Sequence, residues 1–471
     1  MGLADTAVRE ARERVRSAIL NSGFDFPSGR ITANLAPAYL RKIGPGFDLA
    51  LALGVLAASG QVSDGHLESW AVHGELSLGG EIRPGRGTLA VAEGVRRAGL
   101  DGLIVPWESS AEAALVDGLA VIPAAGLRDA VELLDGERAI EAPEPGVREP
   151  EPREEADLED VAGQVEAVYA MEIAAAGGHN LLLEGPPGIG KTMLARRLPG
   201  ILPPLTREEA LEVTRIYSVA GRHDGGGLIT RRPFRAPHHT ISASGLVGGG
   251  PRPVPGEASL AHHGVLFLDE LSEFPRPALE ALRQPLEDGR ATIVRGQRAR
   301  TFPTRFMLVA ATNPCPCGYA GDPRRCRCTE SDVARHRRRL SGPLLDRIDL
   351  LCALERPPAP HLAAPSGAGS AGVRERVMRA RAAQAGRFAG TGIACNGHMD
   401  TAALRAHARL ADGAEQRLRE AYEREALSAR GMHRVVRVAR TIADLEPSAA
   451  IEERHIAEAV QYRGWEHAAA S

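Results

Sequence analysis

The sequence predicts an α/β protein built on a parallel sheet with crossover helices, with an α+β block before it and a helical block after it. Three apolar runs in the middle of the chain, HNLLLEG, GVLFLDE and FMLVAATN, alternate with helical stretches, as strands of a parallel sheet do. From residue 373 the spacing of Ala, Leu, Arg and Glu takes on the helical period. A length of 471 residues fits roughly three domains.

Two stretches without periodicity separate these blocks. Residues 141–160 hold nine acidic residues, two arginines and four prolines, so they cannot bury enough apolar surface to fold alone. Residues 356–372 are rich in Pro, Ala, Gly and Ser, which is typical of a linker. We therefore expect domains at 1–140, 159–355 and 373–471, with linkers at 141–158 and 356–372.

In the first block the sequence predicts a helix over ARERVRSAIL, then short strand-like pieces, and an alanine-rich helix over FDLALALGVLAASG. No apolar run approaches the ~20 residues of a membrane span, and no secretory signal opens the chain, so we expect a soluble cytoplasmic protein without a membrane partner.

The charge composition is unusual in one respect. Of the 57 basic residues only Lys42 and Lys191 are lysine. Because arginine serves wherever a plain positive charge suffices, a retained lysine can mark chemistry that needs a compact ammonium group. For Lys42 chance is the preferred explanation. The net charge of −3 argues against a uniformly basic nucleic-acid coat, but it averages segments of opposite sign.

The motif GPPGIGKT at 185–192 follows an apolar run and opens the helical stretch MLARRL, which is the context of a phosphate-binding loop. Backbone N–H groups of residues 188–192 would hold the β-phosphate, Lys191 would reach the β and γ oxygens, and the Thr192 hydroxyl would hold Mg²⁺. The motif therefore predicts ATP and Mg²⁺ as cofactors. The predicted nucleotide contacts are Gly185, Pro186, Pro187, Gly188, Ile189, Gly190, Lys191, Thr192 and Met193.

Three further segments supply candidate catalytic groups. In VLFLDE, Asp269 would join the Mg²⁺ shell and Glu270 would polarise the attacking water. Asn313 ends the next strand and could orient that water, with a turn-forming Asn before Pro314 as the alternative. In SGPLLDRIDL, Arg347 could stabilise γ-phosphate charge in a neighbouring subunit, although a surface salt bridge is the simpler reading.

These residues together resemble AAA+ ATPases. Longer segments resemble the magnesium-chelatase-like AAA+ proteins of the ComM (also called YifB) competence family over nearly the whole chain; they are GGHNLLLEGPPGIGKTMLARRLPGILPPL, RPFRAPHHTISASGLVGGG, SLAHHGVLFLDELSEF, LRQPLEDG, ATNPCPCG and LSGPLLDRID. The resemblance implies that Asn313 is sensor 1, that Arg347 is the arginine finger, and that the last block is a helical lid. It makes Arg430 the sensor-2 candidate, with Arg434 and Arg437 as alternatives. It also implies a hexameric ring and ATP-driven branch migration of DNA in natural transformation.

The first block resembles the proteolytic domain of Lon protease. In an ungapped alignment Gly46 stands at the position of the nucleophilic serine and Leu89 at that of the lysine, so a Ser-Lys peptidase is excluded and a scaffold or binding role is expected. Family members normally carry further strand sequence before a segment like GLADTAVRE. The resemblance therefore implies a misassigned start or an N-terminally incomplete first domain.

Basic residues concentrate at 290–339, with twelve arginines against three acidic residues. The part ATIVRGQRARTFPTRF alternates like a β-hairpin, with Arg295, Arg298 and Arg300 around its turn. By resemblance to AAA+ helicases this hairpin would point into the ring pore and contact the DNA backbone; a solvated charged hairpin is the alternative. The glycine-rich segment 238–256 could form a second pore loop, or its paired His238 and His239 could be structural.

Four of the six cysteines form the pattern C-x-C-x8-C-x-C, namely Cys315, Cys317, Cys326 and Cys328. Four thiolates could bind Zn²⁺ tetrahedrally, but one-residue spacing is tighter than the usual two to four, and reduced thiols are the alternative. Cys352 and Cys395 are isolated and are expected in the core.

The sequence thus predicts an Mg·ATP-hydrolysing hexameric motor that acts on DNA by branch migration or helicase-type translocation. The first alternative is the motor subunit of a magnesium chelatase, disfavoured here by the cysteine quartet and the Lon-like block. A remodelling ATPase with a substrate other than DNA is a second. A non-enzymatic scaffold is a third, disfavoured by the intact Lys191, Asp269 and Glu270.

Overall fold

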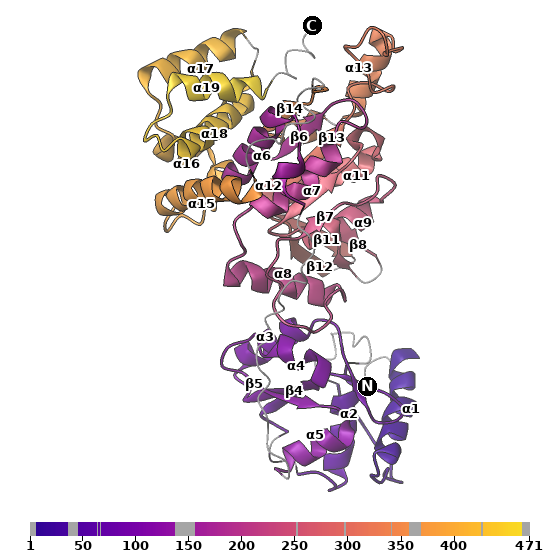
Figure 1. The fold of residues 1–471 in the computed structure, drawn as a ribbon. Helices are drawn as coiled ribbons and strands as arrows, with labels where there is room; N and C mark the ends of the chain where they lie inside the picture. Colours follow the sequence, from indigo (N-terminus) through magenta and orange to yellow (C-terminus); the bar gives the residue numbers. More distant parts are fainter. Residues whose placement is uncertain are drawn as a thin grey trace. The chain divides into compact units, whose positions relative to one another are not determined.

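The computed structural model describes most of the chain (Figure 1). The described residues are 6–35, 46–63, 65, 67–136, 156–250, 253–295, 298–340, 342–357, 369–424 and 427–463. Most of both expected linkers, at 141–155 and 358–368, and Lys42 lie outside them.

The chain divides into two compact units, and each is described by itself. Unit 1 comprises Met1–Pro150 and Thr206–Thr230, and unit 2 comprises Glu151–Leu205 and Arg231–Ser471. Across the described residues we find no helix with the length and apolar character needed to cross a membrane.

Unit 1 contains a three-stranded parallel sheet in the order β1-β4-β5. Alternate residues of β4 enter two separate cores: Ile104 packs with α1, α2 and α5, while Leu103 and Val105 pack with α3 and α4. The predicted helices α1 and α2 are confirmed, but no strand forms in the described residues between them. The bounds are α1 Thr6–Asn21, α2 Asp48–Ala58, β1 Trp70–Val72, β2 Glu75–Leu76, β3 Ile82–Arg83, α3 Thr88–Ala98, β4 Gly102–Pro106, α4 Trp107–Ala113, β5 Ala120–Ala124 and α5 Leu127–Leu134.

Unit 1 also includes α8, Arg207–Val219, which the sequence placed within the middle block. The helix begins with a capping box in which Thr206 and Glu209 each accept a backbone N–H. Arg215 then pairs with Glu93 of α3 at 2.5 Å. Charged partners in the N-terminal block thus hold a segment that follows the phosphate-binding motif in sequence.

Unit 2 contains the predicted parallel sheet, with five strands in the order β14-β6-β13-β10-β7. Leu181 and Leu183 of β6 enter one core, and Leu182 enters the other. The central strands read as continuous apolar runs because both faces of the sheet are covered. The bounds are β6 Leu181–Glu184, β7 Phe234–Arg235, β10 Val265–Leu268, β13 Met307–Thr312 and β14 Leu350–Ala353.

Helices cover both faces of this sheet. One core joins the sheet to α6, α7 and the C-terminal helices, so the predicted helical block shares its core with the strands (Figure 1). The opposite core holds α9 and α11. The bounds are α6 Val165–Gly177, α7 Lys191–Ile201, α9 Ala243–Val247, α10 Glu257–Leu260, α11 Arg276–Ala281, α12 Arg283–Asp288, α13 Glu330–Arg339, α14 Gly342–Leu345, α15 Ser370–Arg387, α16 Thr401–His407, α17 Asp412–Arg424, α18 Ala429–Leu445 and α19 Glu453–Gln461.

A buried ion pair anchors the segment after α8 within unit 1. His223 Nδ1 lies 3.2 Å from Glu112 Oε2, with both side chains about 5% exposed or less. Burial by itself would raise the pKa of Glu112, but hydrogen bonds from His223 and from the Leu89 N–H lower it. Burial would likewise lower the pKa of His223, but Glu112 raises it. Both shifts favour the charged pair.

We predict that Glu112→Gln weakens protection of residues 206–230 against hydrogen exchange in the full chain. Breaking a buried pair costs about 3 kcal/mol or more, which is an exchange rate faster by roughly 100-fold where local opening controls exchange. The matched control is Glu93→Gln, whose pair with Arg215 is more exposed and is worth about 1 kcal/mol or less. Equal increases in exchange rate for Glu112→Gln and Glu93→Gln would contradict the conclusion that the buried pair anchors residues 206–230.

The pair also predicts a pH dependence. The stability that His223 contributes is fully present below pH 6.5, the pKa of this group in the unfolded chain. It is lost as pH rises through the raised pKa of the folded protein. The stability that Glu112 contributes is fully present above pH 4.5, the pKa of this group in the unfolded chain. It is lost as pH falls through the lowered pKa of the folded protein. The difference in exchange between wild type and Glu112→Gln should therefore be largest between pH 4.5 and 6.5 and shrink on either side. Exchange rates corrected for intrinsic chemistry at each pH provide the measurement.

Candidate active site

The phosphate-binding motif forms a loop between β6 and the first residue of α7. Gly188 and Gly190 adopt φ of 75° and 101°, a left-handed backbone that glycine accepts without strain. The helix begins at Lys191, so its free N–H groups face the loop. This is the geometry that binds a phosphate at a helix N-terminus.

Lys191 is 9% exposed, and its ammonium group links the loop to a neighbouring strand. Nζ donates to the carbonyl oxygens of Gly185 at 2.5 Å and Pro186 at 3.0 Å, and to Oδ1 of Asn313 at 2.9 Å. Burial lowers the pKa of Lys191, and the nearby carboxylates of Asp269, Glu184 and Glu270 oppose that shift. The cation is thus held among acceptors that a phosphate could replace.

Thr192 and Asp269 lie together as a magnesium site requires. Thr192 Oγ1 donates to Asp269 Oδ2 at 2.6 Å, which joins the start of α7 to the end of β10. A hydroxyl and a carboxylate are oxygen ligands that Mg²⁺ accepts, together with water and phosphate oxygens. The two residues therefore fit an Mg²⁺ ion bound with a nucleotide.

Glu270 adopts a strained backbone, with φ of 53° in the left-handed region. Its carboxylate is 57% exposed, and Oε2 lies 3.4 Å from Nδ1 of His239. His238 instead bonds the Thr240 hydroxyl at 3.0 Å. One of the two paired histidines thus contacts the predicted catalytic carboxylate, a contact that their sequence position did not reveal.

Asn313 follows β13, between β6 and β10 in the sheet. Its side chain accepts from Lys191, and its carbonyl oxygen bonds His336 Nε2 of α13 at 2.9 Å. Sequence reasoning missed His336, because no motif marks it and it lies 23 positions further along the chain.

Arg347 lies after α14 with its side chain 11% exposed and forms an ion pair with Glu287 of α12. The arginine-finger role stays a prediction. Of the three sensor-2 candidates, Arg430 lies exposed in the first turn of α18, whereas Arg434 is buried and donates to the Leu345 and Ile348 carbonyls at 3.5 Å each. Arg434 therefore contacts the segment that carries Arg347.

The basic segment forms the predicted hairpin. Strands β11, Arg290–Arg295, and β12, Arg298–Pro303, pair antiparallel, and Arg295 faces Arg298 as the last pair. The side chains of these two arginines and the turn at 296–297 lie outside the described residues. Arg300 is exposed on β12.

The glycine-rich segment contains α9 and two strands of two residues each, β8 Gly248–Gly249 and β9 Val254–Pro255. These strands pair antiparallel, and residues 251–252 between them lie outside the described part. The arrangement leaves the pore-loop interpretation as a prediction.

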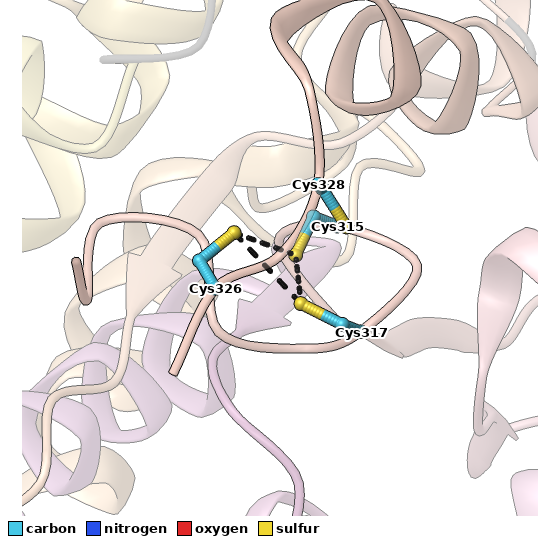
Figure 2. Close-up of side chains that lie close together, drawn as sticks. All are labelled: Cys315, Cys317, Cys326 and Cys328. Carbon is cyan, nitrogen blue, oxygen red and sulfur yellow. Dashed lines mark hydrogen bonds between the residues drawn. The ribbon is translucent and has the colours of Figure 1, made fainter. Parts of the chain in front are cut away.

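The four clustered cysteines bring their sulfurs together (Figure 2). Backbone N–H groups of Arg327 and Tyr319 lower the pKa of the Cys317 thiol to about 6. Cys352 and Cys395 are buried in unit 2, as expected.

In unit 1, neither Lon-equivalent position carries a nucleophile or base. Gly46 lies in the turn before α2, and Leu89 is fully buried in α3, where its N–H donates to Glu112 Oε1 at 2.8 Å. The side chains needed for Ser-Lys chemistry are therefore absent at both positions.

The strand order and the groups gathered at the carboxyl edge of the sheet place the chain among the AAA+ ATPases. Family models described as magnesium chelatase, subunit ChlI, and its C-terminal region match residues 157–362 and 367–463. A model described as subunit ChlI of Mg-chelatase matches residues 1–109.

Several relatives match over nearly full length. Competence protein ComM of Haemophilus influenzae is 42% identical over 472 residues, covering 98% of this chain and 91% of ComM. YifB of Escherichia coli is 43% identical over 466 residues, covering 98% and 90%. An uncharacterised protein of Mycobacterium tuberculosis is 45% identical over 467 residues, covering 98% and 92%. The chain belongs to the ComM/YifB family of magnesium-chelatase-like AAA+ proteins.

Two findings concern the N-terminal block. Lon protease 2 of Bacillus subtilis is 28% identical over 173 residues, which is 34% of this chain. The match of residues 1–109 to a model named for a chelatase subunit means that this block does not argue against the chelatase alternative. Of the two sequence features that disfavoured the magnesium chelatase alternative, the cysteine quartet remains.

We predict that Lys191→Ala lowers ATP affinity by at least about 10- to 100-fold. A charge-assisted hydrogen bond of the kind that an ammonium makes to phosphate is worth roughly 1.5–3 kcal/mol. Equilibrium binding of a fluorescent ATP analogue provides the measurement. Arg196→Ala, an exposed cation on the same helix, is the control and should bind normally. Unchanged affinity in the Lys191 variant would refute the site.

Glu270→Gln should keep ATP binding but slow hydrolysis by about 10²- to 10⁴-fold, because an amide cannot accept the proton of the attacking water. Single-turnover hydrolysis separates the two steps. Glu273→Gln, three residues further along in the same segment, should hydrolyse at the wild-type rate. Full hydrolysis by the Glu270 variant would remove this residue from the mechanism.

Proposed function

We propose that this protein is an Mg·ATP-hydrolysing motor that assembles into a hexameric ring and moves DNA, by branch migration or helicase-type translocation. The proposal places the protein in the cytoplasm and its activity in recombination or natural transformation. The family membership supports the ATPase, and the name of the Haemophilus influenzae relative, competence protein ComM, supports the competence role.

Hydrolysis would use the groups gathered around Lys191. The ammonium would exchange its carbonyl acceptors for β and γ oxygens, while Thr192 and Asp269 hold Mg²⁺. Glu270 would take the proton of a water oriented by Asn313. Because Lys191 already contacts Asn313, binding of phosphate would change the position of that side chain as the ammonium turns toward the nucleotide.

The observation that carries the DNA proposal is the β11–β12 hairpin. Residues 304–306 connect β12 to β13, and Asn313 follows β13, so a single strand separates the hairpin from the nucleotide site along the chain. Register places Arg295 and Arg298 at the tip, and Arg300 is exposed beside them. Arginine residues near the turn of a hairpin are suited to binding the phosphate backbone, which carries no sequence information.

Ring assembly would give Arg347 its role. Its ion pair with Glu287 would have to open for the guanidinium to reach the γ-phosphate of a neighbouring subunit. Arg434 and Arg463 both donate to the Ile348 carbonyl, at 3.5 and 2.8 Å, so C-terminal residues hold the segment next to Arg347. Movement of the C-terminal helices would therefore change the position of Arg347.

The chelatase motor subunit is kept as the second candidate because three family models carry the name of that subunit. The two candidates differ in what stimulates hydrolysis: DNA for the first, and partner subunits with a porphyrin for the second.

We predict that branched DNA raises the ATPase rate of the wild-type protein and that binding weakens steeply with salt. Arg298→Ala and Arg300→Ala should each lower the affinity for DNA whatever its base sequence. Each should also reduce the slope of log affinity against log salt concentration by about one. Arg419→Ala, an exposed arginine of α17, is the control and should leave both unchanged. Wild-type protein with neither DNA binding nor DNA-stimulated hydrolysis would sink the DNA proposal.

A further inference from the structure

The segment between β13 and α13 is long and has no regular structure of its own. Residues 313–329 form neither helix nor strand, yet the chain here makes a succession of defined turns. Loops of this length without secondary structure are uncommon unless something other than a ladder holds them. The four clustered cysteines all lie in this segment.

Their sulfurs converge on one point (Figure 2). All four Sγ atoms lie within 4.8 Å of one another. The distances are 3.4 Å between Cys315 and Cys317, 3.8 Å between Cys317 and Cys326, and 4.0 Å between Cys315 and Cys326. All are free thiols, and these separations are too long for a disulfide bond.

A tetrahedral zinc site requires this spacing. With Zn–S bonds of about 2.3 Å, the edge of a regular ZnS₄ tetrahedron is about 3.8 Å. The three observed separations lie on either side of that edge. The one-residue spacing within each C-x-C pair, tighter than in most zinc sites, therefore does not prevent convergence.

One of the four sulfurs also accepts hydrogen bonds from backbone donors. The N–H groups of Tyr319 and Arg327 donate to the Cys317 sulfur. Donors of this kind stabilise negative sulfur and fix the orientation of a ligand.

The loop also touches the nucleotide site. It leaves the sheet at Asn313, whose Oδ1 accepts from Lys191. Gly318 packs so closely on the phosphate loop that a Cβ there would lie 2.6 Å from Cδ of Pro187. The chain then enters α13, where His336 bonds the Asn313 carbonyl. The position of Asn313 and the packing against Pro187 of the phosphate loop thus depend on the conformation of residues 313–329.

We infer that Cys315, Cys317, Cys326 and Cys328 bind one structural Zn²⁺ that closes this loop and positions Asn313 and Pro187 at the nucleotide site. The metal half of the inference stands on the cysteine geometry alone, whereas the positioning half rests on the proposed ATPase function. The four protein ligands leave no open position, which is the arrangement of a structural rather than a catalytic zinc site.

Elemental analysis of the purified full chain tests the metal half. We expect about one zinc per chain, and its loss in Cys317→Ser and Cys326→Ser. Cys352→Ala removes one thiol outside the cluster, and this control should keep the metal. Wild-type protein with no zinc, or with iron in its place, would overturn the assignment.

A second measurement does not depend on whether the variants fold. Wild-type protein stripped of metal and titrated with Co²⁺ should develop the visible spectrum of a tetrahedral tetrathiolate, and Zn²⁺ should displace it. A Co²⁺ spectrum typical of oxygen or nitrogen ligands, or no spectral change, would contradict the four-thiolate site.

The affinity for nucleotide, measured without DNA, tests whether the zinc positions Asn313 and Pro187. Removal of zinc should weaken binding of a fluorescent ATP analogue by about 10-fold or more, and added Zn²⁺ should restore it. Affinity that does not change when zinc is lost would overturn positioning and leave the metal site standing. Failure of DNA stimulation would affect neither half, so the outcomes are distinguishable from a failure of the proposed function.

Discussion

The hydrogen bonds of the Lys191 ammonium are the interaction on which the arrangement of the site depends. One nitrogen donates to two carbonyls of the phosphate loop and to the Asn313 side chain. A flexible point charge with three donors can do this in a narrow space, whereas a planar guanidinium fits such a place poorly. That requirement explains why a chain that uses arginine at nearly every basic position keeps a lysine here.

The sheet makes this convergence possible. Strands β6, β10 and β13 run parallel, so their carboxyl ends lie at one edge of the sheet. A shift in register by one residue would move their side chains from one core into the other. The phosphate loop, Asp269 and Asn313 each follow one of these strands. The loop that continues from Asn313 then carries the cysteine cluster back against Pro187, so a metal there would act on the nucleotide site through packing.

Unit 1 and unit 2 each gain their stability from segments distant in sequence. In unit 1, α8 pairs with α3, and the segment after it pairs with Glu112. In unit 2, buried Asp444 of α18 accepts from Arg387, Arg440 and Asn396, which ties the C-terminal helices together. A buried carboxylate with this many donors has its oxygens satisfied, and the loss of any one donor would leave part of it unpaired.

The sequence by itself determined the three central strands of the large sheet, a helix after the phosphate-binding motif, the hairpin before β13 and the family. These features rest on short-range patterns: apolar runs, the spacing of glycines before a lysine, and alternation around a turn. Only the tertiary structure decided that α8 packs within unit 1, that His239 contacts Glu270, that Arg434 rather than Arg430 contacts the segment of Arg347, and that the four sulfurs lie close enough for one metal ion. Each of these depends on two or more segments far apart in the chain, whose distance is set by packing and register and leaves no local pattern of residues.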